Sequence, residues 1–186
     1  MQVVTDEEMR SFLNRHDDLR CEGRQLSFDH TEAKTIIVDL RVSEPHQLVY
    51  LARLAAHLTN EEALFRAASL WITLWGVWDS QVEAVGFTAM ERIRQGYGEN
   101  RPLNTAPGHF FRHDEFVESL ACLVQPMLVW WDAYYVPQWA GGLDYFLFVS
   151  HDGFLDIETR TTEMYEKALE ILKFHEWPKV RVRSKA

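Results

Sequence analysis

Asp132 has the most unusual chemical surroundings in this sequence, because it lies within the run Trp-Trp-Asp-Ala-Tyr-Tyr. An ionised carboxylate among aromatic side chains is costly unless it is paired or hydrogen-bonded. If the run is a β-strand, Trp130, Asp132 and Tyr134 share one face of it. Two interpretations stay open. The carboxylate is either satisfied internally by arginine or backbone donors, or it belongs to a pocket whose aromatic walls receive a cation or polar ligand.

A second group of reactive side chains lies in residues 96–113, a long stretch without clear periodicity. Loops of this length are uncommon in compact domains and often act as lids or binding loops. Such a loop could bind an anion or move protons through Tyr97, Arg101, His109 and His113. A surface crossing whose polar groups only meet water is the plainer alternative.

His109 and His113 also have the i, i+4 spacing of a metal-binding helix, with Asp114 next to them. Pro107 and Gly108 make a helix at His109 doubtful, and Asp114 is more simply explained as a helix N-cap. We therefore predict no metal site. The sequence also lacks a phosphate-binding loop and a nucleophile elbow, so we predict no cofactor and assign no catalytic residue.

The charge balance favours a basic partner. With 28 acidic and 19 basic residues, the formal net charge is −9, which argues against nucleic acid as the default partner. We expect a non-enzymatic module of inhibitor or adaptor type that binds another macromolecule, in a complex that salt weakens. The alternative is a small-molecule binder or enzyme with a pocket between loop 96–113 and the Asp132 region, taking a small polar ligand. A homodimer built on exposed aromatic side chains is also compatible with the sequence.

The expected compartment is the cytoplasm. The first residues lack the basic and apolar regions of a signal peptide, and no apolar run has the length of a membrane span. Cys21 and Cys122 are too far apart in sequence for a metal-binding pair, and we expect both to be reduced.

Three tryptophans dominate the pattern of expected helices. Trp71, Trp75 and Trp78 are spaced i, i+4, i+7, which predicts a central Trp-rich helix near 61–79. Pairs of the capping-box type divide a helical run over 44–95 into three helices. Further helices are expected from Thr5 to about Arg20, over about 115–125, and over about 162–175.

Strand signals fall in two regions, 25–42 and 127–160. The first reads as a hairpin of 25–30 with 34–42, and the second as strands at 127–136, 144–150 and 154–160. His151-Asp152-Gly153 marks a tight turn between the last two strands. Residues 127–136 could also continue the helix before them, kinked at Pro126.

The expected fold is therefore α+β, with an antiparallel sheet of about five strands packed against about six helices. We expect one domain over residues 1–178. Residues 179–186 carry four basic side chains and no acid, and they read as a basic C-terminal tail or an edge strand.

Overall fold

The structure is a computed structural model of the 186-residue chain. It describes residues 1–23, 25–40, 69–76, 89–129, 131–138, 143–174 and 180–184.

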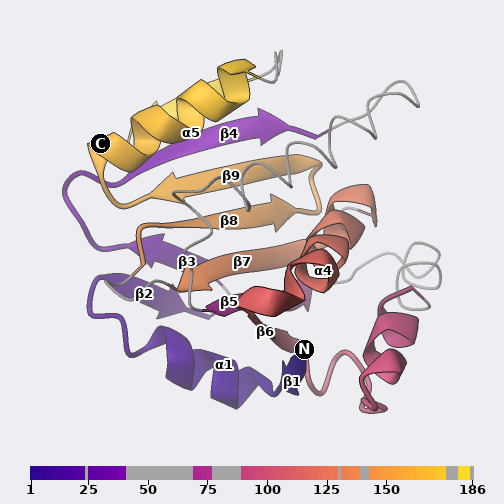
Figure 1. Cartoon of the computed structure of the whole chain (residues 1–186). Coiled ribbons are helices and arrows are strands. Elements are labelled where there is room, and N and C mark those ends of the chain that lie inside the picture. Colours follow the sequence, from indigo (N-terminus) through magenta and orange to yellow (C-terminus); the bar gives the residue numbers. More distant parts are fainter. Residues whose placement is uncertain are drawn as a thin grey trace.

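An eight-stranded antiparallel sheet forms the centre of the described structure, in the order β1-β6-β5-β7-β8-β9-β4-β10 (Figure 1). A separate two-stranded hairpin is formed by β2 (Leu19–Glu22) and β3 (Gln25–Phe28). The strands of the large sheet are β1 (Gln2–Val4), β4 (Lys34–Asp39), β5 (Ser69–Gly76), β6 (Gly108–Arg112), β7 (Asp132–Gln138), β8 (Tyr145–Ser150), β9 (Phe154–Thr159) and β10 (Val180–Ser184).

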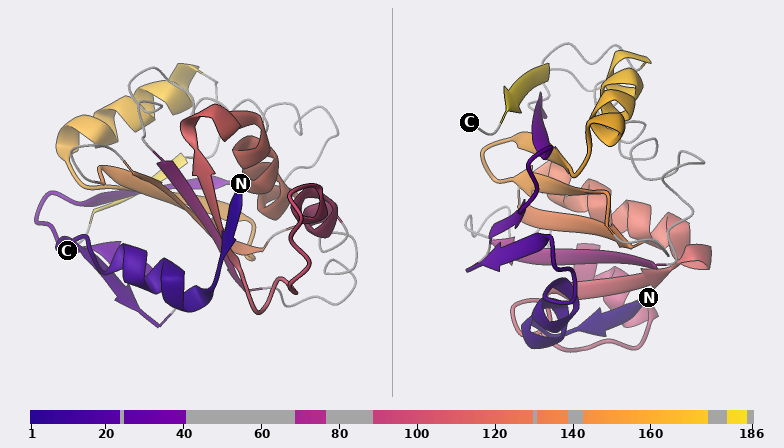
Figure 2. Two further views of the ribbon diagram at one scale, coloured as in Figure 1. Left: turned by 60° about the horizontal axis from the view of Figure 1, so that its bottom comes forward. Right: turned by 90° about the vertical axis from the view of Figure 1, so that its left-hand side faces the viewer.

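Both faces of the sheet are covered, as the two views of Figure 2 show. Helices α4 (Phe116–Val129) and α5 (Thr162–Phe174) lie over one face, which we call the helix face. Helix α1 (Asp6–Leu13) and the β2–β3 hairpin lie over the other, the hairpin face. Each face has its own apolar cluster, so the sheet is a central layer between two cores.

Neighbouring residues of β7 belong to different cores. Tyr135 lies in the cluster on the helix face, whereas Tyr134 lies in the cluster on the hairpin face. This is the alternation that a strand imposes on consecutive side chains. It determines which residues can share a site, because a residue on one face cannot reach a cavity on the other.

The predicted Trp-rich helix near 61–79 is wrong. Residues 69–76 form β5, which pairs with β6 on one side and β7 on the other. Ile72, Thr73 and Leu74 are all buried, which shows that both faces of this strand are covered. A strand buried on both faces has no polar side, so its apolar run resembles that of a buried helix. Trp78 and residues 61–68 lie outside the described residues.

Two further strand predictions need correction. The expected hairpin between 25–30 and 34–42 is wrong, because β3 pairs with β2 while β4 pairs with β9 and β10. The expected strand 127–136 begins too early. Helix α4 continues through Pro126 to Val129, and β7 begins only at Asp132.

The α+β class agrees with the structure, but about six helices and about five strands do not. The described residues contain three complete α-helices, a helical segment over 89–96 and a 3-10 turn at His113–Glu115. Residues 41–68 and 77–88, where one expected helix and the beginning of another fall, lie outside them. No helix in the described part of the chain combines the length and apolarity that crossing a membrane requires.

Three local predictions are confirmed. The Thr5–Glu8 capping box begins α1, with reciprocal hydrogen bonds between the two residues. The expected end of this helix near Arg20 is wrong, because α1 ends at Leu13 and Arg20 lies in β2. The turn at residues 151–153 joins β8 to β9, and Gly153 has the positive φ of 79° that favours glycine. Helix α5 occupies nearly the expected range. At the far edge of the sheet, β10 pairs with β4.

Candidate functional site

A groove opens on the hairpin face, between the large sheet and the β2–β3 hairpin. Its cavity volume is about 650 Å³, within the range typical of ligand sites. The floor comes from β7, β8, β9 and the turn after β8, and the wall comes from the hairpin. The lining residues are Arg20, Glu22, Gln25, Leu26, Ser27, Asp132, Tyr134, Phe146, Phe148, Ser150, His151, Asp152, Phe154, Asp156 and Glu158.

The hairpin is fixed over the sheet by two backbone donors of β3. The N–H of Leu26 donates to the Tyr134 hydroxyl at 3.3 Å, and the N–H of Phe28 donates to Glu158 Oε1 at 2.7 Å. Leu26 and Phe28 are two residues apart on β3, so their N–H groups point to the same side of the strand, away from β2. Side chains of the floor therefore satisfy backbone groups of the wall, which sets the width of the groove.

Aromatic rings form the floor. Tyr134 and Phe148 are cross-strand partners, and their rings stack with centroids 4.6 Å apart and planes inclined by 26°. Phe154 meets Phe148 edge to face at 6.5 Å, and Phe146 lies 5.9 Å from Tyr134. Such contacts hold the rings in place without any polar group. The half-buried Phe148 and Phe154 rings are the part of this floor that is open to the groove, whereas Tyr134 and Phe146 are buried beneath it.

Asp132 lies at the end of this floor and is held by the turn that follows β8. Its Oδ1 accepts a hydrogen bond from the His151 backbone N–H at 2.9 Å and lies 2.8 Å from His151 Nδ1. The Asp132 side chain is 17% exposed and that of His151 is 45% exposed. Asp132 is thus mostly buried and accepts hydrogen bonds from within the protein, which agrees with the first of the two interpretations of its sequence. It also lines the groove.

The groove is strongly acidic. Among the described residues, five carboxylate residues line it, against one arginine and one histidine. The arginine, Arg20, already pairs with Asp29 at 2.5 Å. Burial raises the pKa of Tyr134, the hydrogen bond from Leu26 lowers it, and the negative charges of Asp132, Glu158 and Asp156 raise it further. The negative charges of three carboxylates therefore all act on the Tyr134 hydroxyl.

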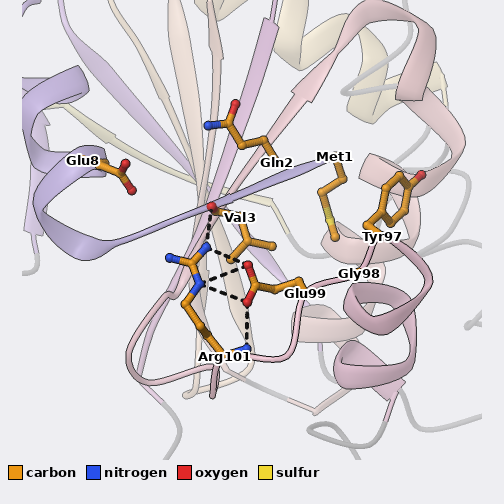
Figure 3. A pocket seen from close by; sticks show the side chains of 8 residues that line it. All are labelled: Met1, Gln2, Val3, Glu8, Tyr97, Gly98, Glu99 and Arg101. Carbon is orange, nitrogen blue, oxygen red and sulfur yellow. Dashed lines mark hydrogen bonds and ion pairs between the residues drawn. The ribbon is translucent and has the colours of Figure 1, made fainter.

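Arg101 lies elsewhere, in a second pocket of about 460 Å³ beside β1. Figure 3 shows its guanidinium held between the Glu99 carboxylate and the Val3 carbonyl oxygen. Hydrogen bonds from Arg101 are the largest cause that lowers the pKa of Glu99, to about 2. Arg101 is thus engaged in an internal ion pair and does not reach the groove.

His109 is also separated from Asp132. It lies in β6, opposite Ile72, and Ile72 in turn pairs with Tyr135 of the helix face. The side chain is 0% exposed, and Arg94 Nη1 lies 3.4 Å from its Nε2. Burial, with the Arg94 charge as the second cause, lowers the pKa of His109 to about 3. His109 is therefore a neutral core residue.

Arg94 is itself buried and holds the segment that precedes β6. Its guanidinium donates to the carbonyl oxygens of Ala106 at 2.9 Å and Arg101 at 2.8 Å. The expected long loop over 96–113 is accordingly shorter, because residues 108–112 form β6. Its remaining part is fastened to the core by a buried cation.

The structure brings together two of the six predicted ligand-binding residues, Asp132 and Tyr134. Arg101 and His109 lie apart from them, and Trp130 and the side chain of His113 lie outside what the structure describes. Among the described residues, no group of three or more metal-ligating side chains has a suitable arrangement.

Sequence reasoning missed most of the groove, including His151, Phe148, Asp156 and Glu158. The alternation Phe-Leu-Asp-Ile-Glu-Thr in β9 was the available signal, since it places both acids on one strand face. Comparisons with protein-family models, curated proteins and solved structures find no match to this chain.

Proposed function

We propose that the protein binds a basic protein or peptide, and that the groove on the hairpin face receives a cationic side chain of this partner. The observation that carries the proposal is the lining of the groove, in which the described residues include five carboxylate residues against one arginine and one histidine, over a floor of aromatic rings. Carboxylates attract the charge, and aromatic rings accept both the apolar stem and the cation.

The charge of the whole chain supports the same partner. A net charge of −9 attracts basic molecules at long range and repels acidic ones. Lysine and arginine side chains combine a long apolar stem with a charged end. The floor and the carboxylates of the groove match these two parts. Among the described residues, no arrangement of catalytic side chains lines the groove. We propose binding and assign no reaction.

Fluorescence anisotropy with labelled octalysine and octaarginine tests the proposal, with octaglutamate as the acidic comparison. We expect both basic peptides to bind at about 50 mM salt, to bind much more weakly at about 500 mM salt, and octaglutamate not to bind. Asp132→Asn keeps an oxygen that accepts the His151 hydrogen bonds and removes one charge from the groove. We expect it to weaken binding about fivefold, or about 1 kcal/mol.

Glu163→Gln is the matched control, because Glu163 is an exposed residue of α5, on the helix face. It removes the same charge from the protein at a distance from the groove. We expect its affinity to stay close to that of the wild type. If neither basic peptide binds, or if both variants weaken binding equally, the groove is not the binding site and the proposal is wrong.

A further inference from the structure

Strand β1 is one edge of the large sheet, because it pairs with β6 and with no other described strand. The backbone groups of an antiparallel strand point alternately to its two sides. The Pro107 carbonyl oxygen, just before β6, accepts from the Leu74 N–H of β5 at 3.1 Å, so the groups of Gly108 point the other way, toward β1. Val4 is the cross-strand partner of Gly108. Its neighbour Val3 therefore points its N–H and its carbonyl oxygen outward, at the edge of the sheet.

Arg101 covers the outward carbonyl oxygen of Val3. Its Nη2 donates to this oxygen at 3.0 Å. Just beyond the strand, the Thr5 N–H donates to Glu8 Oε2 at 2.7 Å. The exposed backbone groups of an edge strand are a template for pairing with another chain. A further strand needs the Val3 carbonyl oxygen as an acceptor, so Arg101 competes directly with such a strand.

Glu99 holds the Arg101 guanidinium in one orientation. Nε and Nη2 of Arg101 donate to the two carboxylate oxygens at distances from 2.6 to 3.1 Å, as Figure 3 shows. The Arg101 backbone N–H donates to Glu99 Oε1 at 2.7 Å, and the Glu99 side chain is only 14% exposed. A guanidinium bonded to both oxygens of a carboxylate has a defined geometry. Arg101 is therefore directed at the edge of β1 by a fixed neighbour.

The space beside this edge is a cavity. It has a volume of about 460 Å³ and is lined by residues of β1, by Glu8 and by residues of the segment 97–101 (Figure 3). The outward groups of Val3 thus face a space that another chain could enter. Arg101 and Glu99 both line this space.

We propose that the Arg101–Glu99 pair closes the β1 edge against pairing with β1 of a second copy of this chain. Two copies related by a two-fold axis at Val3 can exchange N–H···O bonds between their Val3 residues, because each copy offers the same donor and acceptor. Such pairing continues the sheet from one copy into the other. The guanidinium prevents it by occupying the acceptor in each copy. No residue of the groove takes part, so this edge and the proposed function are independent of each other.

Sedimentation velocity at increasing protein concentration tests the proposal. Arg101→Ala removes the guanidinium, and Glu99→Ala releases it from its fixed orientation. We expect both variants to self-associate about tenfold more tightly than the wild type. In hydrogen exchange, the Val3 amide of these variants should become slower to exchange as the concentration rises. Thermal unfolding identifies which variants are folded, and one folded variant is sufficient for the test.

The variant Val3→Pro, added to Arg101→Ala, examines the contact itself. Proline removes the outward N–H and leaves the hydrogen bonds of β1 to β6 in place, as it does at the outer side of edge strands. We expect this double variant to sediment as the wild type does. If it stays as associated as Arg101→Ala alone, the contact does not use the Val3 groups and the proposal is wrong.

Arg92→Ala and Glu91→Ala are the matched controls for charge, because both residues are exposed in the helical segment 89–96 and neither lines the cavity. Each should sediment as the wild type does. Equal association of a control and its matched variant would show that lost charge, and not the open edge, is the cause. Unchanged sedimentation of folded Arg101→Ala or Glu99→Ala would likewise overturn the proposal.

Discussion

The buried His109 predicts that the protein loses stability in mild acid. Its imidazole is 0% exposed and lies beside the Arg94 guanidinium, and its pKa is lowered from the ordinary value of 6.5 to about 3. In the unfolded chain the ring binds a proton at a higher pH than in the folded chain. Stability from this residue is therefore fully present above about pH 6.5 and is lost as the pH falls toward 3.

The size of the loss follows from the pKa difference. One pKa unit corresponds to about 1.4 kcal/mol. At about pH 4.5, two units below the ordinary value of 6.5, the cost is about 2.7 kcal/mol relative to neutral pH. That is a large part of the 5–15 kcal/mol of net stability found in typical domains, about half at the lower end.

The variant His109→Gln isolates this effect, because glutamine keeps an acceptor for Arg94 and does not titrate. Urea unfolding followed by tryptophan fluorescence, at several values between about pH 7 and about pH 4.5, gives the free energy of unfolding of both proteins. The difference between wild type and variant should change by about 2–3 kcal/mol over this range, in favour of the variant at low pH. Other groups that titrate in acid are present in both proteins, so their contributions cancel in the difference between the two free energies of unfolding.

A difference that stays constant with pH would refute the reasoning, whatever the variant costs at neutral pH. Titration of the histidine ring protons by NMR gives an independent check on the folded state. The His109 resonances should not shift between about pH 7 and about pH 4.5. A midpoint near 6.5 would show that the folded core admits the charged ring.

Two further predictions concern the groups that position the groove and the segment before β6. Tyr134→Phe leaves the buried N–H of Leu26 without its acceptor, and we expect a loss of about 1–3 kcal/mol with faster hydrogen exchange at Leu26; unchanged exchange there would contradict the role of the hydroxyl. Arg94→Met removes the donor to the carbonyl oxygens of Ala106 and Arg101, and we expect a loss of about 2 kcal/mol in urea unfolding, with increased exchange confined at first to residues 99–107. Equal stability of the Arg94→Met protein would show that desolvation of the guanidinium offsets those hydrogen bonds.

The parts of the fold that could be predicted from sequence are those determined by neighbouring residues. The capping box at Thr5 and Glu8 satisfies backbone donors only a few residues away. The turn before Gly153 needs a positive φ at one position. Helix α5 has one exposed and one buried side, so its periodicity is clear.

The remaining parts depend on partners that are distant in sequence. Strand β5 is covered on both faces, so its apolar run carries no period that separates strand from helix. The expected strand over 127–136 begins directly after Pro126, whereas in the structure Pro126 lies inside α4. Strands β3 and β4 follow each other in sequence yet pair with different neighbours.

The candidate site was predictable to the same extent. Asp132 and Tyr134 lie two residues apart, and the alternation of a strand is enough to place them on one face. Their partners Leu26 and Glu158 come from segments whose proximity is established only by tertiary pairing. His109 and Asp132 were grouped by chemical type, which carries no information about the two faces of a sheet.

The order of strands in the large sheet also determines the order in which the groove is built. Strands β7, β8 and β9 are consecutive in sequence, so their contacts close short loops. The wall joins the floor through two hydrogen bonds, and the residues that each bond connects are separated by 108 and 130 positions in the sequence. Long-range contacts are slow to form because loop closure costs entropy before any contact repays it. We therefore expect the floor to be present in the transition state for folding and the hairpin to close over it afterwards.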